Sequence, residues 1–314
     1  MKRIKLTVAY DGTEYSGWQI QPNAPTIEAE LDRAIKQLTG ESLHVIGASR
    51  TDAGVHALGN VAVFDTESTI PGDRWAYAVN RYLPPQISVV DSREVKPDFH
   101  PRHCNTRKTY EYKILNAKFP IPQLRNYAWY VPGQLDIDLM RQAAERLIGE
   151  HDYKSFCCVR TQAESTVRTV YSIELEEESA PTGIKTGAVE LCSLGYEAAG
   201  SIGTDETGET GGDAEAGGDG GISEVDIENS SHRTQRADEG RIITMRITGN
   251  GFLYNMVRII TGTLVQAGKG LITPDDVSRM LEKCDRNAAG QTAPPQGLTL
   301  VNIEYVDGDG GRYP

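Results

Sequence analysis

Strand-like and helix-like hydrophobic patterns follow one another in the same order twice along this chain. IKLTVAY (4–10) alternates as a half-buried strand does, and TIEAELDRAIKQL (26–38) places its apolar residues on one helical face behind Thr26, a suitable N-cap. The first half continues with strand, strand, helix and strand patterns at 43–48, 60–66, 72–83 and 87–95. This βαββαβ order predicts a ferredoxin-like unit.

The second half repeats the order with one added helix. A strand (109–116), a helix (136–150), strands (167–177, 241–249), helices (252–268, 273–284) and a closing strand (298–305) are predicted. We therefore expect an α+β protein made of two ferredoxin-like repeats whose mixed or antiparallel sheets join, with helices on one side. The expected subdomains are 1–97 and 98–314.

An acidic, glycine-rich stretch interrupts the second repeat. Residues 176–240 hold sixteen Asp/Glu and three Lys/Arg, so they account for the net charge of −12, and the remaining 28 acidic and 29 basic residues nearly cancel. Because 198–232 contains almost no large apolar side chains, it cannot bury enough surface to offset the entropy of ordering. We predict a disordered insertion at about 178–239, either a solvated spacer or a segment that repels or mimics polyanions.

Other features exclude several protein classes. The amino terminus, MKRIKLTVAYDG, lacks the apolar core of a signal peptide, and no run is long enough to span a membrane. The five cysteines show no CxxC spacing and are odd in number, which argues against a zinc site and a disulfide framework. We expect reduced thiols in a cytoplasmic protein.

The stretch GASRTDAGVHA (47–57) lies between two predicted strands and holds Arg50 and Asp52 in a glycine-flanked loop. One interpretation is a tight hairpin in which Asp52 makes an Asx-turn and Arg50 a surface ion pair. The other is a carboxylate kept ionised by a nearby guanidinium, its pKa lowered by roughly 1–3 units, and so available as a nucleophile.

Three further segments could contribute to a site. FHPRHCNTRKTYEYK (99–113) interleaves Arg102, Arg107, Lys108 and Lys113 with aromatic rings, which suits RNA or a solvated connector. In NGFLYNMVR (250–258), Arg258 is a cation on an otherwise apolar helix, so it is either exposed or paired with an anion. The loop YDGTEYSGWQIQP (10–22) is either a binding loop or a structured turn.

Taken together in this order, GASRTDAGVHA, YDGTEYSGWQIQ, DFHPRHCNTRKTYEYKI, NGFLYNMVR and GLTLVNIEY resemble the TruA family of tRNA pseudouridine synthases. The resemblance implies a pseudouridine-synthase core and isomerisation of uridine at positions 38, 39 and 40 of the tRNA anticodon stem-loop. It also implies no cofactor, no metal, no membrane and a homodimer.

The same resemblance implies roles for individual residues. Asp52 corresponds to the nucleophile, Tyr110 to the tyrosine that stacks on the target base, and Arg258 to the basic partner of the carboxylate. Arg50 is implied to contact RNA, and Leu298 to form an apolar wall of the base pocket. Ser49, Asn60 and Asn255 depart from the glycine, glutamine and histidine that are common at their positions.

Two other functions compete with this one. A non-catalytic tandem RNA-binding module would be expected to carry an RNP-type aromatic strand motif, which is absent. A two-carboxylate hydrolase needs a partner acid for Asp52, and no motif supplies one. The sequence also leaves open whether Asp52 attacks C1′, adds to uracil C6 or removes the C2′ proton.

Overall fold

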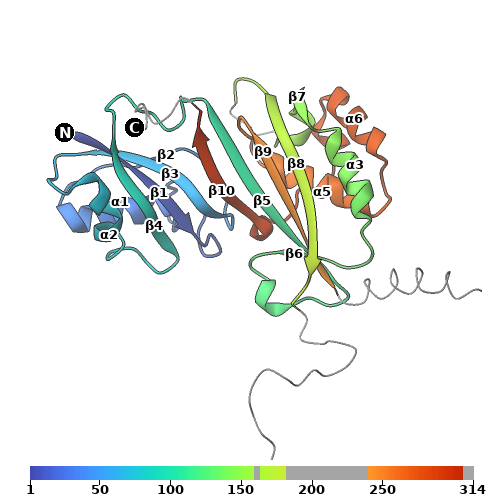
Figure 1. The fold of residues 1–314 in the computed structure, drawn as a ribbon, viewed down its shortest axis with the longest axis horizontal. Coiled ribbons are helices and arrows are strands. Elements are labelled where there is room, and N and C mark those ends of the chain that lie inside the picture. The colour runs from blue at the N-terminus through green and yellow to red at the C-terminus, as the bar shows by residue number, and fades with distance from the viewer. Residues whose placement is uncertain (159–162, 182–239, 307–314) are drawn as a thin grey trace, which may run out of the picture. The chain divides into compact units, whose positions relative to one another are not determined.

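A computed structural model of the protein describes residues 1–158, 163–181 and 240–306. Within these ranges the chain forms helices and one ten-stranded mixed sheet, which confirms the predicted α+β class. The strand order is β4-β1-β3-β10-β5-β9-β8-β7, with β2 paired to β3 and β6 paired to β5. Figure 1 shows this succession, with β10 between β3 and β5.

The amino-terminal strands are arranged around β1 (Lys2–Tyr10), which pairs antiparallel with β3 (His56–Thr66) and β4 (Ile87–Val95). The short β2 (Ile46–Gly47) pairs with β3. Helix α1 (Ile27–Thr39) follows β1 in the chain, and α2 (Trp75–Val79) follows β3. Both helices lie beside this part of the sheet in Figure 1.

The carboxy-terminal strands are arranged in the same way around β5 (Thr106–Asn116). It pairs antiparallel with β9 (Arg241–Gly249), which pairs with β8 (Val167–Ser179). The short strands β6 (Trp129–Val131) and β7 (Gly149–Asp152) extend the sheet beside β5 and β8. The helices of this part are α3 (Ile137–Glu145), α5 (Met256–Gly268) and α6 (Pro274–Lys283).

The last strand, β10 (Leu298–Tyr305), joins the two groups of strands. It runs antiparallel to β5 and parallel to β3, where Thr299 faces His56 and Leu300 faces Ala57. The start of β3, directly after the RTDAG motif, is therefore held against the carboxy-terminal half of the molecule.

The apolar face of α1 is buried as its periodicity predicts. Ile27, Leu31 and Ile35 are fully buried, and the Thr26 hydroxyl accepts a hydrogen bond from the backbone of Ala29. Helix α5 is apolar on nearly all sides, and it lies within the main core cluster. No helix in the described part of the chain is long and apolar enough to cross a membrane.

Two predicted helices end several residues earlier than the pattern suggests. In place of a helix over 72–83, a 3-10 turn (Gly72–Arg74) leads into the five-residue α2, because the Asn80 side chain bonds both backbone groups of Val89 and so ends the helix against β4. In place of a helix over 136–150, α3 stops at Glu145, since Gly149 adopts a positive φ of 117° at the start of β7.

The predicted insertion leaves and re-enters the sheet at one point. β8 and β9 stay paired up to Ser179 and Arg241, and Ala180 N–H donates to the Gly240 carbonyl at 3.0 Å. β8 therefore extends two residues into the range predicted as insertion, whereas residues 182–239 lie outside the described residues.

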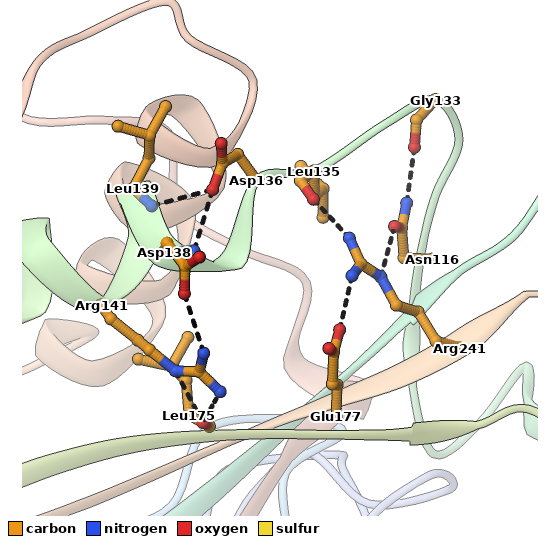
Figure 2. A network of polar contacts seen from close by, with 10 residues as sticks. All are labelled: Asn116, Gly133, Leu135, Asp136, Asp138, Leu139, Arg141, Leu175, Glu177 and Arg241. Carbon is orange, nitrogen blue, oxygen red and sulfur yellow. Dashed lines mark hydrogen bonds and ion pairs between the residues drawn. The ribbon is translucent and has the colours of Figure 1, made fainter. Parts of the chain in front are cut away.

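Arg241 secures this point of entry, as Figure 2 shows. Its guanidinium donates to Asn116 Oδ1 at 3.2 Å, to a Glu177 carboxylate oxygen at 2.5 Å and to the carbonyl of Leu135. Asn116 in turn donates to the carbonyl of Gly133. The base of the β8–β9 connection is thereby tied to β5 and to the segment that leads into α3.

Replacing residues 181–239 with an Asn-Gly turn is expected to preserve the fold, because Ala180 and Gly240 already face each other across a hairpin. The melting temperature should change by less than about 4 °C, the effect of roughly 1 kcal/mol, in a calorimetric scan. Arg241→Met in the shortened protein should lower the melting temperature clearly, because it removes the hydrogen bonds to Asn116, Glu177 and Leu135. Loss of cooperative unfolding in the shortened protein alone would contradict this prediction.

Candidate active site

The connection between β2 and β3, which carries the RTDAG motif, rests on the loop after β1. Trp18 N–H donates to the Thr51 carbonyl at 3.1 Å, and Gly54 N–H donates to the Tyr15 carbonyl at 3.2 Å. Gly17 has a φ of 90°, and a Cβ there would lie 2.5 Å from the Thr51 carbonyl oxygen. The loop 10–22, left open by the sequence, therefore supports this motif, and its Ser16, Gln19 and Gln21 line the same cleft as Asp52.

Asp52 and Arg258 form an ion pair. Arg258 Nη1 lies 2.9 Å from Asp52 Oδ2, and the exposed fractions of the two side chains are 15% and 23%. Arg258 is on the first turn of α5, 206 residues from Asp52 in the chain. Of the two alternatives that the sequence left for Arg258, the structure favours the paired cation.

The Arg258 guanidinium is fixed by two further contacts. Its Nε donates to the Ala293 carbonyl at 2.8 Å, and its Nη1 also donates to Asn255 Oδ1 at 2.9 Å. Asn255 precedes α5 with a φ of 63°, a left-handed conformation that asparagine tolerates well, and α5 therefore begins four residues later than its apolar pattern predicts. These contacts aim the guanidinium at Asp52.

A guanidinium does lower the pKa of Asp52 as expected, but the net shift is upward. Burial raises the pKa of Asp52 above the ordinary value for aspartate, and the hydrogen bond and charge of Arg258 oppose that shift only in part. Desolvation disfavours the charged carboxylate more than one partner compensates. Arg50, two residues from Asp52, is exposed and makes no contribution to this shift.

Tyr110 lies on β5 beside this pair. Its ring is 7% exposed and meets Phe252 edge to face with centroids 5.3 Å apart, and its hydroxyl lies 2.9 Å from the Ser49 hydroxyl. Burial raises the pKa of Tyr110 to about 12, with a smaller contribution from the charge of Asp52. Ser49, one of the three departures from the family pattern, thus holds the tyrosine that the resemblance implies as a base-stacking residue.

Asn60, a second departure, anchors the same loop from β3. Its amide donates to the Ser49 carbonyl at 3.0 Å and to the Tyr10 hydroxyl at 3.3 Å. The Tyr10 hydroxyl also lies 2.8 Å from the Thr51 hydroxyl. Buried polar groups that satisfy one another make a loop rigid, so the backbone on both sides of Arg50 is fixed.

Ser49, Asp52, Tyr110 and Arg258 line a cleft of about 1010 Å³. Its described lining contains one carboxylate, Asp52, and the cations Arg50, Arg102, Lys108, Arg168 and Arg258. Leu298, at the start of β10, adds a buried apolar side chain. The structure thus brings all five residues that the resemblance implies to one cleft. No group of three or more metal-ligating side chains is found among the described residues.

The basic segment 99–113 is divided between two locations. Arg102 and Lys108 line the cleft, whereas the Arg107 guanidinium lies 5.1 Å from the Tyr171 ring and Lys113 pairs with Glu111. Lys108 and Tyr110 share one face of β5 because side chains alternate along a strand. Only part of the segment therefore contributes to the cleft.

Comparison with known proteins decides the family. The family model described as tRNA pseudouridine synthase matches residues 6–103 and 143–306. The chain belongs to the tRNA pseudouridine synthase family. A protein of Acetivibrio thermocellus named tRNA pseudouridine synthase A is 39% identical over 97% of this chain and 100% of its own length. A Bacillus subtilis protein of the same name is 37% identical over 96% of this chain and 99% of its own length.

Sequence reasoning missed several residues that line the cleft of this family member or hold its loop in place. Ser49 and Asn60 were identified only as departures, and their hydrogen bonds to Tyr110 and Tyr10 join residues 61 and 50 positions apart. Arg168 gave no signal at all, because its segment was predicted only as a strand. Its place in the cleft depends on the pairing of β8 with β9.

Ser49→Ala is expected to destabilise the protein by about 1–3 kcal/mol, because the buried Tyr110 hydroxyl then loses its partner. Tyr110→Phe combined with Ser49→Ala should cost less than the sum of the two single changes. Urea unfolding of the four proteins measures this coupling. Strict additivity would show that the hydroxyl pair does not couple the loop to β5.

Asp52→Asn is expected to be at least as stable as the unaltered protein at neutral pH. A folded-state pKa above the unfolded value means that the folded protein binds the proton more tightly, so stability falls as pH rises through that interval. The advantage of Asp52→Asn should shrink as the pH approaches about 3.9, the ordinary aspartate value. Thermal melts across pH measure it.

Asp65→Asn is the matched control for this prediction. A hydrogen bond from Arg3 lowers the pKa of Asp65, so its ionised form stabilises the fold and the substitution should be destabilising at neutral pH. A loss of stability in both variants would mean that the ion pair with Arg258 outweighs the burial of Asp52.

Proposed function

We propose that this protein converts uridine to pseudouridine at positions 38, 39 and 40 of the tRNA anticodon stem-loop, without cofactor or metal. The observation that carries the proposal is the half-buried Asp52–Arg258 ion pair, 2.9 Å long, beside Tyr110 in a cationic cleft. The family supplies the reaction class, and the positions 38–40 come from the motif resemblance. The expected partner is tRNA, which the protein binds as a cytoplasmic homodimer.

The reaction breaks the N1–C1′ bond of the nucleotide, rotates the uracil and joins C5 to C1′. It needs no external oxidant, and it is a net isomerisation because the proton released from C5 is matched by one taken up at N1. Asp52 is the nucleophile or base in each of the three routes, by attack on C1′, addition to C6 or removal of the C2′ proton. Arg258 orients the carboxylate and opposes its protonation, and this effect is strongest when the cleft excludes water.

A uridine within a stem has to leave its stack before Asp52 can reach it, which costs a few kcal/mol. Tyr110 lines the cleft on the strand next to β10 and offers the ring that stacks on the extruded base, a contact worth about 1–3 kcal/mol. Leu298 forms the apolar wall, and Arg50 contacts the RNA at the exposed side of the motif.

The architecture supports a repeat origin for this site. The order β4-β1-β3-β2 in residues 1–97 matches the order β10-β5-β9-β8 in residues 98–314, position by position along each half. We take the two halves as ferredoxin-like subdomains. The first contributes Asp52, and the second contributes Tyr110, Arg258 and Leu298.

Tritium release from tRNA labelled at uridine C5 tests this function. The unaltered protein should release tritium, and Asp52→Asn should release it at least about a thousandfold more slowly while still binding tRNA. Asp138→Asn, an exposed aspartate on α3, is the control. Arg258→Lys keeps the charge but not the planar fork of donors, so turnover should also fall.

Three outcomes would overturn the proposal. A binding module releases no tritium, a hydrolase leaves an abasic site, and full turnover in Asp52→Asn removes this carboxylate from the mechanism. Mapping of pseudouridine in the product then assigns the positions.

A further inference from the structure

Two cations of the cleft bind consecutive carbonyls just ahead of the RTDAG motif. Arg102 Nε donates to the Gly47 carbonyl at 2.7 Å, and Lys108 Nζ donates to the Ala48 carbonyl at 3.1 Å. Both residues come from the segment that leads into β5 and from β5 itself. They therefore connect the two halves of the molecule at the root of the loop that carries Asp52.

These contacts leave donors available within the described residues. A lysine ammonium has three N–H donors and a guanidinium five, and in the described part of the chain Lys108 and Arg102 each donate to one carbonyl. Arg168, the third cation, donates to the carbonyls of Ser165 and Val167 at 2.9 and 2.6 Å and also lines the cleft. All three side chains therefore line the same cleft and keep donors beyond these carbonyl contacts.

The charge of this part of the cleft is not balanced by its lining. Asp52 is the one acidic residue of the described lining, and it is paired with Arg258. Glu28 attracts Arg102 from outside the lining, but burial and Arg50 have larger and opposite effects on its pKa. Burial and the charges of Arg102 and Arg168 lower the pKa of Lys108 to about 8. An anionic ligand would relieve this repulsion.

We propose that Lys108, Arg102 and Arg168 form a subsite for a backbone phosphate adjacent to the target uridine. The inference rests on the proposed function, because it takes Tyr110 as the residue that stacks on the base. Lys108 and Tyr110 are two residues apart on one face of β5, which places their Cα atoms about 6.6 Å apart. A base on Tyr110 thus has its own phosphates within reach of Lys108.

The subsite has a consequence for catalysis. A phosphate held by Lys108 and Arg102 is also attached, through the carbonyls of Gly47 and Ala48, to the loop that carries Asp52. Binding of the RNA backbone and placement of the carboxylate are therefore joined by one set of hydrogen bonds.

The test compares anticodon stem-loops that differ in one linkage. Each carries a neutral methylphosphonate on the 5′ or the 3′ side of the target uridine, and binding to the full-length protein is followed by fluorescence anisotropy. One of the two replacements should weaken binding by about tenfold, as expected for loss of a charge-assisted contact. Lys108→Met should bind the phosphodiester RNA about tenfold more weakly than the unaltered protein does. It should bind the RNA with the sensitive methylphosphonate as well as the unaltered protein does.

Lys113→Met is the matched control, since it removes a lysine of the same strand that lies outside the cleft lining. It should leave the difference between the linkages unchanged. Lys108→Arg should restore binding, and it should also abolish the weakening that the unaltered protein shows as pH rises through about 8. For Lys108→Met, the slope of log Kd against log salt should fall by about 0.7–0.9.

If Lys108→Met weakens binding equally for the phosphodiester RNA and both methylphosphonate RNAs, the subsite is refuted. Lys108 would then have a purely structural role. The replaced linkages keep the proposal falsifiable even if Lys108→Met fails to fold, because they leave the protein intact. Tritium release by the unaltered protein is read separately. If tritium is released but the two methylphosphonate RNAs bind equally well, only the subsite is refuted. If one methylphosphonate RNA binds more weakly but no tritium is released, the proposed reaction is refuted and the subsite is not.

Discussion

The ion pair between Asp52 and Arg258 is the contact on which the arrangement of the cleft depends. It joins a loop of the first half to a helix of the second, and Ala293 and Asn255 fix the guanidinium from two other directions. Removing Arg258 would leave the half-buried Asp52 carboxylate without its cation, which costs more than the loss of one contact. The pair therefore couples the integrity of the fold to the chemistry of Asp52.

The charge of the whole chain gives little guidance to the charge of the cleft. The formal net charge is −12, yet cations dominate the described lining around Asp52. Polyelectrolyte binding responds to the local density of charge that faces the ligand, and distant charges are screened within about 8–10 Å at physiological salt. An acidic protein can thus present a strongly cationic surface to RNA without contradiction.

Sequence reasoning predicted the elements with clear periodicity. The apolar helix left Arg258 either exposed or paired with an anion, and the family resemblance implied its pairing with Asp52. Sequence reasoning failed where distant contacts decide the outcome. The helix predicted over 72–83 is cut short by Asn80 binding to Val89, and burial reverses the expected direction of the pKa of Asp52. The hydroxyl of Ser49 has a clear purpose only once Tyr110 is placed opposite it. Such contacts depend on strand register, which local pattern does not encode.

The position of β10 has a consequence for the order in which the protein can be made. This strand is the last element of the described chain, yet it occupies the middle of the sheet, between β3 and β5. During synthesis β3 at His56 and Ala57 and β5 at residues 106–112 lack this partner until residues 298–305 have left the ribosome, and unpaired edges are sites of aggregation. A chain that ends before residue 298 therefore lacks the strand that joins β5 to β3, the strand directly after the loop of Asp52.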